Sequence, residues 1–212
     1  PQDVPALVEK IGKQRFTDRL LWGFNQDEAW RYNAPNDQYW DPPVVQGNQQ
    51  SMHFAFLFNY ADTPWHTQRW SRSILDRYYG YGIANAYLGD EDQGQMSAVS
   101  ALMALGLFSV NGGSDINPCY EITAPVFDEI TIKLDSRYYP GKEFKITTKH
   151  QNAADSRSID DIGSDCYIQS TMLNGRKHDT FRLPHSTFSG GGELQILLGP
   201  EPNRTWGISE SE

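Results

Sequence analysis

The sequence has little cysteine, no excess of basic residues and no long apolar run, and each shortage narrows what the chain can be. Two cysteines, Cys119 and Cys166, leave one disulfide or two buried thiols equally open and fix no redox compartment. Lys and Arg number 18 against 27 Asp and Glu, and the net charge of −9 argues against a nucleic-acid partner. No apolar stretch approaches the roughly 20 residues of a membrane-spanning helix, and no signal peptide is present. The composition therefore predicts an acidic protein with neither a nucleic-acid partner nor a membrane span.

The chain also lacks an initiating methionine, since it opens with Pro1-Gln2-Asp3-Val4. We interpret it as a processed or excised piece of a longer polypeptide. Aromatic residues, in contrast, are plentiful at 13%, with six tryptophans. Such a content fits a protein that stacks rings on sugars, although core packing uses tryptophan as readily.

Helical patterns dominate the chain up to about Val110. The spacing of apolar residues predicts helices over residues 6–21, 52–60, 67–79 and 96–108, the first of them broken by Gly12. Residues 25–50 form a long irregular stretch with Trp30 and Trp40, which indicates an ordered functional loop. Helices that come in pairs joined by functional loops are typical of a barrel of helical hairpins. We therefore expect residues 1–112 to belong to a barrel of helical hairpins.

After Gly112-Gly113 the apolar period changes from that of helices to that of strands. Alternation predicts strands over 127–134, 144–149, 167–169, 172–173 and 194–198, and Asn174-Gly175 is a strong hairpin signal. The expected fold class is thus α+β, with a small antiparallel β-sandwich at 113–212. We see no catalytic constellation in this half, and expect surface or turn roles for His150, His178, His185, Asp160, Asp161 and Asp179.

The most informative segment is Gly89-Asp90-Glu91-Asp92-Gln93-Gly94, which directly precedes the helix predicted from Met96. The glycines permit a tight turn, so Asp90 and Asp92 can project from a loop. The N-terminus of the helix carries unpaired N–H groups and a positive dipole end, and both stabilise a carboxylate anion. Such a carboxylate suits a general base or a metal ligand. The alternative is that Asp92 only caps the helix.

Several segments in order resemble glycoside hydrolase family 92, the calcium-dependent exo-α-mannosidases. The resemblance covers nearly the whole chain and corresponds to the C-terminal half of the family. It implies that residues 1–112 are the C-terminal part of an (α/α)6 barrel. It rests on Pro1-Gln2-Asp3-Val4, Leu7-Val8-Glu9 with Gly12, Gly47-Asn48-Gln49-Gln50-Ser51, Phe58-Asn59-Tyr60-Ala61 with Pro64-Trp65 and Thr67-Gln68, Gly89-Asp90-Glu91-Asp92 with Gly94, Met96 and Ser97, Tyr167-Ile168-Gln169-Ser170, Leu173-Asn174-Gly175 and Gly199-Pro200-Glu201-Pro202-Asn203.

The resemblance implies an inverting hydrolase that removes terminal α-linked mannose from glycans. Such enzymes place an acid and a base roughly 6.5–9.5 Å apart to admit a water. Asp90 and Asp92 correspond to the family's base pair, with Asp92 the first choice, whereas Glu91 is expected to be structural. The family's general acid lies upstream of Pro1, so the chain should act only with its upstream portion. Asp27-Glu28-Ala29-Trp30 resembles the acid-bearing element superficially but stands out of order.

Calcium is the cofactor that the resemblance implies, with Asn48, Gln49 and Asp92 as the expected ligands. Gln49 stands where the family commonly has Glu, which removes one negative charge from the site. Asn48, Gln49, His53 and Trp40 are the expected substrate-binding residues, and the family implies an extracytoplasmic location. Two alternatives stay open, namely a calcium-dependent glycan-binding protein without turnover and a structural fragment.

Overall fold

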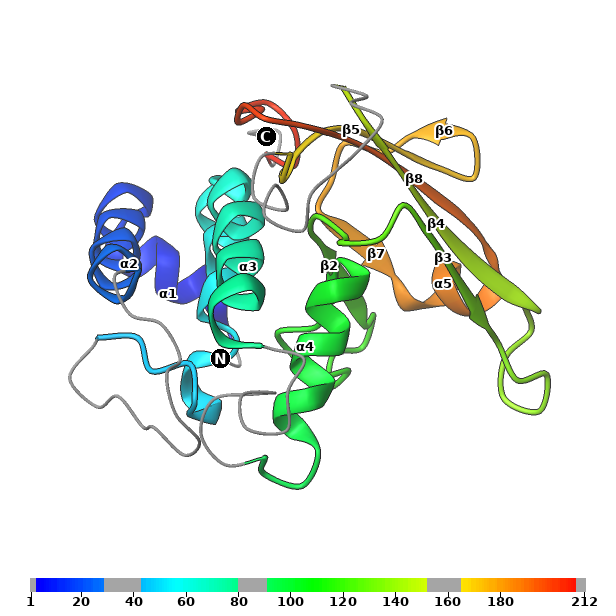
Figure 1. The fold of residues 1–212 in the computed structure, drawn as a ribbon, viewed down its shortest axis with the longest axis horizontal. Helices are drawn as coiled ribbons and strands as arrows, with labels where there is room; N and C mark the ends of the chain where they lie inside the picture. The colour runs from blue at the N-terminus through cyan, green and yellow to red at the C-terminus, as the bar shows by residue number, and fades with distance from the viewer. Residues whose placement is uncertain (1–2, 29–42, 80–90, 152–164, 209–212) are drawn as a thin grey trace.

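A computed structural model describes residues 3–28, 43–79, 91–151 and 165–208. The described chain is a mixed α/β protein in which a group of helices lies beside two sheets (Figure 1). The helical part contains α1 (Val4–Ile11), α2 (Lys13–Asp27), the short 3₁₀ helices η1 (Gln49–Ser51) and η2 (Phe54–Ala61), α3 (Pro64–Tyr78) and α4 (Gln95–Leu105).

Two sheets make up the β part. The first joins β1 (Leu107–Phe108), β2 (Cys119–Ile122) and β7 (Arg182–Pro184), and all its pairs are antiparallel. The second has the order β3-β4-β8-β5-β6 and comprises β3 (Glu129–Lys133), β4 (Glu143–His150), β5 (Tyr167–Leu173), β6 (Arg176–Lys177) and β8 (Gly192–Gly199). The short helix α5 (His185–Gly190) connects the first sheet to β8.

The expectation of a purely antiparallel β half is wrong at the centre of the second sheet. There β8 runs parallel to β4, with Phe144 opposite Gly192 and His150 opposite Leu198, while it pairs antiparallel with β5. Alternation along a strand has the same two-residue period in either orientation, so the pattern alone does not reveal direction. The fold is therefore a mixed sheet.

Local sequence signals set most element boundaries as expected. Gly12, at φ 90°, separates α1 from α2 and so confirms the break at this position. Pro64 opens α3, where its missing N–H costs nothing. At the hairpin between β5 and β6, Asn174 and Gly175 have φ values of 50° and 76°, as a type I′ turn requires.

The helix expected over residues 52–60 is instead the 3₁₀ helix η2, which occupies residues 54–61. Ala55, Phe56, Phe58 and Asn59 are each at most 1% exposed, so tertiary packing surrounds this segment on all sides. Apolar spacing over eight residues does not distinguish i→i+3 from i→i+4 hydrogen bonding. Packing therefore decided the geometry of η2.

Each part has its own hydrophobic core, and α3 connects the two parts. One core gathers buried residues between Val4 and Val110, and the other gathers residues between Leu107 and Trp206. On α3, Gln68 Oε1 accepts a hydrogen bond from the Ile168 amide at 2.9 Å, and Ser71 shares a 2.9 Å hydroxyl–hydroxyl bond with Thr123. These buried bonds fix the helical part on the edge of the β part.

Candidate active site

The turn before α4 is held by Glu91. Its carboxylate accepts hydrogen bonds from the Gly94 amide, from the Ser97 hydroxyl and, at 3.1 Å, from the Ser97 amide. These bonds lower the pKa of Glu91, the Ser97 hydroxyl first among them. Glu91 thus caps the N-terminus of α4, in agreement with its expected structural role.

Asp92 follows Glu91 in a left-handed conformation at φ 55°, and Gln93 (61°) and Gly94 (92°) continue that conformation. Non-glycine residues adopt positive φ at an energetic cost, and such positions cluster at functional sites. The half-buried Asp92 side chain makes no hydrogen bond with any residue of the described ranges. Because Glu91 makes these bonds, the Asp92 side chain does not cap α4 within the described residues, and a catalytic role for its carboxylate stays a prediction.

Asn48, Gln49 and His53 lie around the start of the 3₁₀ helices. Asn48 is half-buried and accepts the Ser51 amide through its carbonyl at 3.0 Å, whereas Gln49 is exposed. Burial lowers the pKa of His53, so its imidazole is neutral near pH 7, and its ring lies edge-on to Phe54 at 5.0 Å. In Figure 1 this segment and the first turn of α4 lie toward the same end of the helical part.

Two predicted site residues, Asp90 and Trp40, lie outside the described residues, as does Trp30. Trp70, in contrast, is 1% exposed in the core and stacks on Phe24 with ring centroids 5.0 Å apart. The structure therefore places Asn48, Gln49, His53 and Asp92 on two segments, and a helix cap fixes the second of them.

The amide oxygens of Asn48 and Gln49 and the carboxylate of Asp92 are hard oxygen donors of the kind that calcium takes. None of these side-chain oxygens bonds to another described residue, so all three remain available to a cation. Within the described ranges no group of three or more His, Cys, Asp or Glu side chains is arranged to hold a metal. The assignment of Asn48, Gln49 and Asp92 as calcium ligands therefore stays a prediction.

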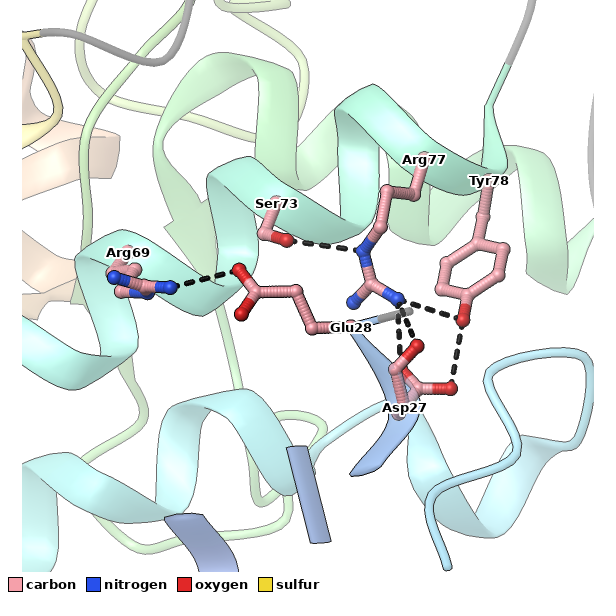
Figure 2. Close-up of polar contacts among 6 residues, drawn as sticks. All are labelled: Asp27, Glu28, Arg69, Ser73, Arg77 and Tyr78. Carbon is pink, nitrogen blue, oxygen red and sulfur yellow. Dashed lines mark hydrogen bonds and ion pairs between the residues drawn. The ribbon is translucent and has the colours of Figure 1, made fainter. Parts of the chain in front are cut away.

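One buried ionic cluster escaped the sequence analysis (Figure 2). The Arg77 guanidinium donates from Nη1 to the Asp27 carbonyl at 2.8 Å and to the Asp27 carboxylate at 3.1 Å. The Tyr78 hydroxyl donates to the other Asp27 oxygen at 2.7 Å. Asp27 lies three residues after Phe24 on the buried face of α2, and this charged residue on an apolar face is the signal that was missed.

Asn59 is a second residue without a predicted role. It is 1% exposed, and neither its Oδ1 nor its Nδ2 has a hydrogen-bond partner among the described residues. A buried amide with no partner is satisfied by ordered water or a ligand group in most proteins. The motif Phe58-Asn59-Tyr60-Ala61 pointed to this segment of the chain, but it gave no role to the Asn59 side-chain amide.

Glu28 forms an ion pair at the surface of the helical part. Its carboxylate forms an ion pair with Arg69 at 2.7 Å, and both side chains are more than 40% exposed (Figure 2). This exposed pair joins the end of α2 to α3. The expectation that Glu28 is not the general acid stays a prediction.

The expected surface role of His150 is wrong. Its side chain is 7% exposed and lies between Asp128 and Asp165, with a nitrogen of the ring 3.4 Å from each carboxylate. His178 contacts the Arg182 carbonyl at 2.9 Å, and His185 contacts the Tyr120 hydroxyl at 3.1 Å. Both cysteines are free thiols, and burial raises the pKa of Cys166 and Cys119.

Two cavities of the described part lie away from the candidate residues. One of about 310 Å³ is lined by Ser109, Cys119, Tyr120 and His185 among others, and one of about 250 Å³ by Lys13, Trp65, His66 and Arg204 among others. Asn48, Gln49, His53 and Asp92 line neither of them. The candidate site is therefore defined by the acidic turn and the 3₁₀ segment.

The comparison with protein families shows that the chain is part of a glycoside hydrolase catalytic domain. The sequence model of the glycosyl hydrolase family 92 catalytic domain matches residues 1–200, and the chain belongs to that family. This finding confirms the family predicted from the motifs.

Solved structures and a relative agree with this assignment. A family 92 alpha-mannosidase from Bacteroides thetaiotaomicron in complex with mannoimidazole has a TM-score of 0.79 and 28% identity, over 99% of this chain and 25% of that one. A family 92 inverting mannosidase from Bacteroides thetaiotaomicron VPI-5482 has a TM-score of 0.74 and 27% identity, over 98% of this chain and 27% of that one. An uncharacterized secreted glycosidase of Arthroderma benhamiae is 26% identical over 100% of this chain and 24% of its own length.

The chain thus spans about a quarter of the length of the relatives that it matches. No helix of the described ranges is long and apolar enough to cross a membrane.

Proposed function

We propose that the chain is a portion of an inverting, exo-acting α-mannosidase that hydrolyses terminal α-linked mannose from glycans. The proposal is supported by the different roles of Glu91 and Asp92 in the turn before α4. Glu91 caps the helix, and the neighbouring Asp92 carboxylate stays unbonded within the described residues at a strained left-handed position. The similarity to family 92 mannosidases at 27–28% identity supports the substrate class.

In this proposal Asp92 is the general base, and Asp90 is the second carboxylate of the pair. A carboxylate base takes a proton from a water that attacks the anomeric carbon, while an acid on the opposite side protonates the leaving oxygen. The acid belongs to the upstream portion of the polypeptide. The rigid cap at Glu91 would keep the Asp92 carboxylate in place, because displacement of a base by about 1 Å costs roughly a hundredfold in rate.

Calcium is the proposed cofactor, held by Asn48, Gln49 and Asp92 with oxygens supplied by the rest of the polypeptide, and when bound it would polarise sugar hydroxyls. His53, neutral near pH 7, and Trp40 are the proposed substrate contacts beside these residues. Gln49 contributes an amide oxygen without charge, which predicts a weaker site than one built with Glu.

We further propose the domain arrangement that the two cores support. Residues 1–112 form the C-terminal part of an (α/α)6 barrel that carries the site, and residues 113–212 form a β-sandwich subdomain. The location is extracytoplasmic, because the Arthroderma benhamiae relative is described as secreted.

A second candidate is a calcium-dependent mannose-binding protein without turnover. Gln49 favours it, because a weaker cation site would bind sugar hydroxyls without distorting the ring. The two candidates differ in one measurable respect, since only the hydrolase releases mannose.

The test measures mannose release from α-linked mannobioses by the full-length protein, with and without a calcium chelator. We expect release that the chelator abolishes, with loss of about a thousandfold in kcat for Asp92→Asn. The matched control is Gln93→Asn, which changes the next residue of the same turn and should keep the wild-type rate. Mannose binding without release in added calcium would establish the binding protein and overturn the hydrolase.

A further inference from the structure

The cluster of Asp27, Arg77 and Tyr78 lies where two helices end. Asp27 is the last residue of α2, and Tyr78 is the last residue of α3. Arg77 Nη1 contacts the Asp27 carbonyl, the Asp27 carboxylate and the Tyr78 hydroxyl, the last at 2.9 Å (Figure 2). The Arg77 Nε also donates to Ser73 Oγ at 3.0 Å. One guanidinium therefore fixes the ends of α2 and α3 to each other.

Physical reasoning favours the interpretation that this cluster positions the two helix ends and adds little to the stability of the fold. The Arg77 and Asp27 side chains are 1% and 2% exposed, and taking both charges out of water offsets most of their attraction. Two helix C-termini also meet here, each with a negative dipole end, and the Asp27 carboxylate adds to that charge. Arg77 contacts the carbonyl and the carboxylate of Asp27, and so offsets part of the negative charge at this meeting of helix ends.

Tyr78 completes the cluster as a donor. Burial, together with the charge of Asp27, raises the pKa of Tyr78, so its hydroxyl stays protonated and donates to the carboxylate. Its ring, 2% exposed, packs in the same core as Met52 and Met96. Met52 stands three residues after Gln49, and Met96 stands four residues after Asp92. Tyr78 therefore belongs to the same hydrophobic core as one residue near each of the two segments that hold the candidate site residues.

We propose that Asp27, Arg77 and Tyr78 are positioning residues, which set the Asp92 turn and the Asn48-Gln49 segment in their working geometry. The expected effect on mannose release rests on the proposed function, whereas the expected effect on the geometry of the two segments does not. The cluster touches no reacting atom and acts through the helix ends and the shared core.

The test compares full-length wild type with Tyr78→Phe and Asp27→Asn. Tyr78→Phe keeps the ring and removes one hydroxyl, so it should fold even where Asp27→Asn, which removes a buried negative charge that Arg77 contacts, does not. The matched control is Glu28→Gln. It breaks an ion pair between the end of α2 and α3 that is exposed and lies outside the cluster.

Two quantities are measured on the folded proteins. The first is hydrogen exchange of the amides of Met96, Ser97 and Ala98, which bond to the Glu91 carbonyl, the Glu91 carboxylate and the Gly94 carbonyl. The second is kcat and KM for mannose release, well below the temperature of unfolding.

We expect Tyr78→Phe to speed exchange at these amides about tenfold and to lower kcat about tenfold with KM changed less than threefold, because positioning acts on the transition state. Glu28→Gln should change neither quantity. Unchanged exchange at residues 96–98 with a lower unfolding temperature would overturn the proposal, since the cluster would then only add stability. Exchange that rises in a protein whose wild type releases no mannose would support positioning while refuting the hydrolase.

Discussion

The Tyr60 hydroxyl donates a 2.6 Å hydrogen bond to the buried carboxylate of Glu121 and so joins η2 to β2 across the boundary of the two cores. The second oxygen of Glu121 accepts the Val110 amide at 3.0 Å. Glu121 is 2% exposed, and its carboxylate depends on these two donors. This bond, with those that α3 makes to Thr123 and Ile168, fixes the helical part relative to the sheets.

Tyr60→Phe should weaken this junction. The substitution leaves one oxygen of a buried carboxylate without its donor, and such a loss costs about 1–3 kcal/mol. The measurement is urea unfolding of the full-length protein, followed by hydrogen exchange of residues 107–122. Tyr138→Phe is the control, because Tyr138 is 75% exposed and its loss should leave the curve unchanged. Equal curves for both variants would show that the Tyr60–Glu121 bond contributes nothing.

Glu121→Gln should change how stability depends on pH. Burial raises the pKa of Glu121 above its usual value of 4.5. The unfolded chain therefore loses this proton at a lower pH than the folded one, so the group's favourable contribution is complete below pH 4.5 and declines as pH rises through the folded pKa. Gln keeps an acceptor for Val110 and cannot ionise, so the variant should lose less stability than wild type above pH 4.5. Parallel stability curves from pH 4 to pH 8 would contradict this expectation.

His66 should make stability depend on pH with a sign opposite to that of Glu121. Burial first, and then the positive charges of Arg204 and Arg69, lower the pKa of His66 to about 4 from 6.5. Between pH 6.5 and about 4 the unfolded chain binds a proton that the folded imidazole rejects, so stability present above pH 6.5 is lost as pH falls. His66→Gln should flatten this loss, even though it removes ring contacts with Phe58 and Trp65. Unfolding temperatures recorded from pH 4 to pH 7 test the slope, and an unchanged slope would refute the assignment.

Gly106→Ala should destabilise the end of α4. Gly106 has φ 74°, and a Cβ there would lie 2.7 Å from Pro125 Cγ and 2.8 Å from the Thr123 carbonyl oxygen. We expect a loss of about 2–4 kcal/mol from strain and clash together. The control is Gly112→Ala at φ 57°, where no atom lies within 4 Å of the new Cβ. This variant should lose only about 1 kcal/mol, and equal losses in urea unfolding would show that the close approach to Pro125 is unimportant.

Features that depend on single residues and their neighbours were predicted correctly. Pro64 begins α3, Gly12 separates α1 from α2, and Asn174-Gly175 makes the hairpin between β5 and β6. Each acts through its own backbone, because proline fixes φ and glycine or asparagine adopts positive φ at low cost. The ordered set of motifs likewise predicted the family correctly.

The sequence predictions that the structure contradicts share a different cause. The parallel pairing of β4 with β8, the 3₁₀ form of η2 and the burial of His150 between Asp128 and Asp165 all depend on partners far away in sequence. At the candidate site, the residue types predicted a cap and a catalytic carboxylate, but which of Glu91 and Asp92 caps α4 was decided by the left-handed turn at residues 92–94.

The sequence by itself determined the family, the order of helices before strands and the turns at Gly12 and Asn174-Gly175, because local backbone preferences and short motifs carry that information. Only the tertiary structure decided the direction of β8 and the meeting of Asp27, Arg77 and Tyr78 at two helix ends. Both arise from contacts between residues about 50 positions apart in the chain. Their energy depends on burial and on charge neutralisation, which exist only once the helices and sheets have packed.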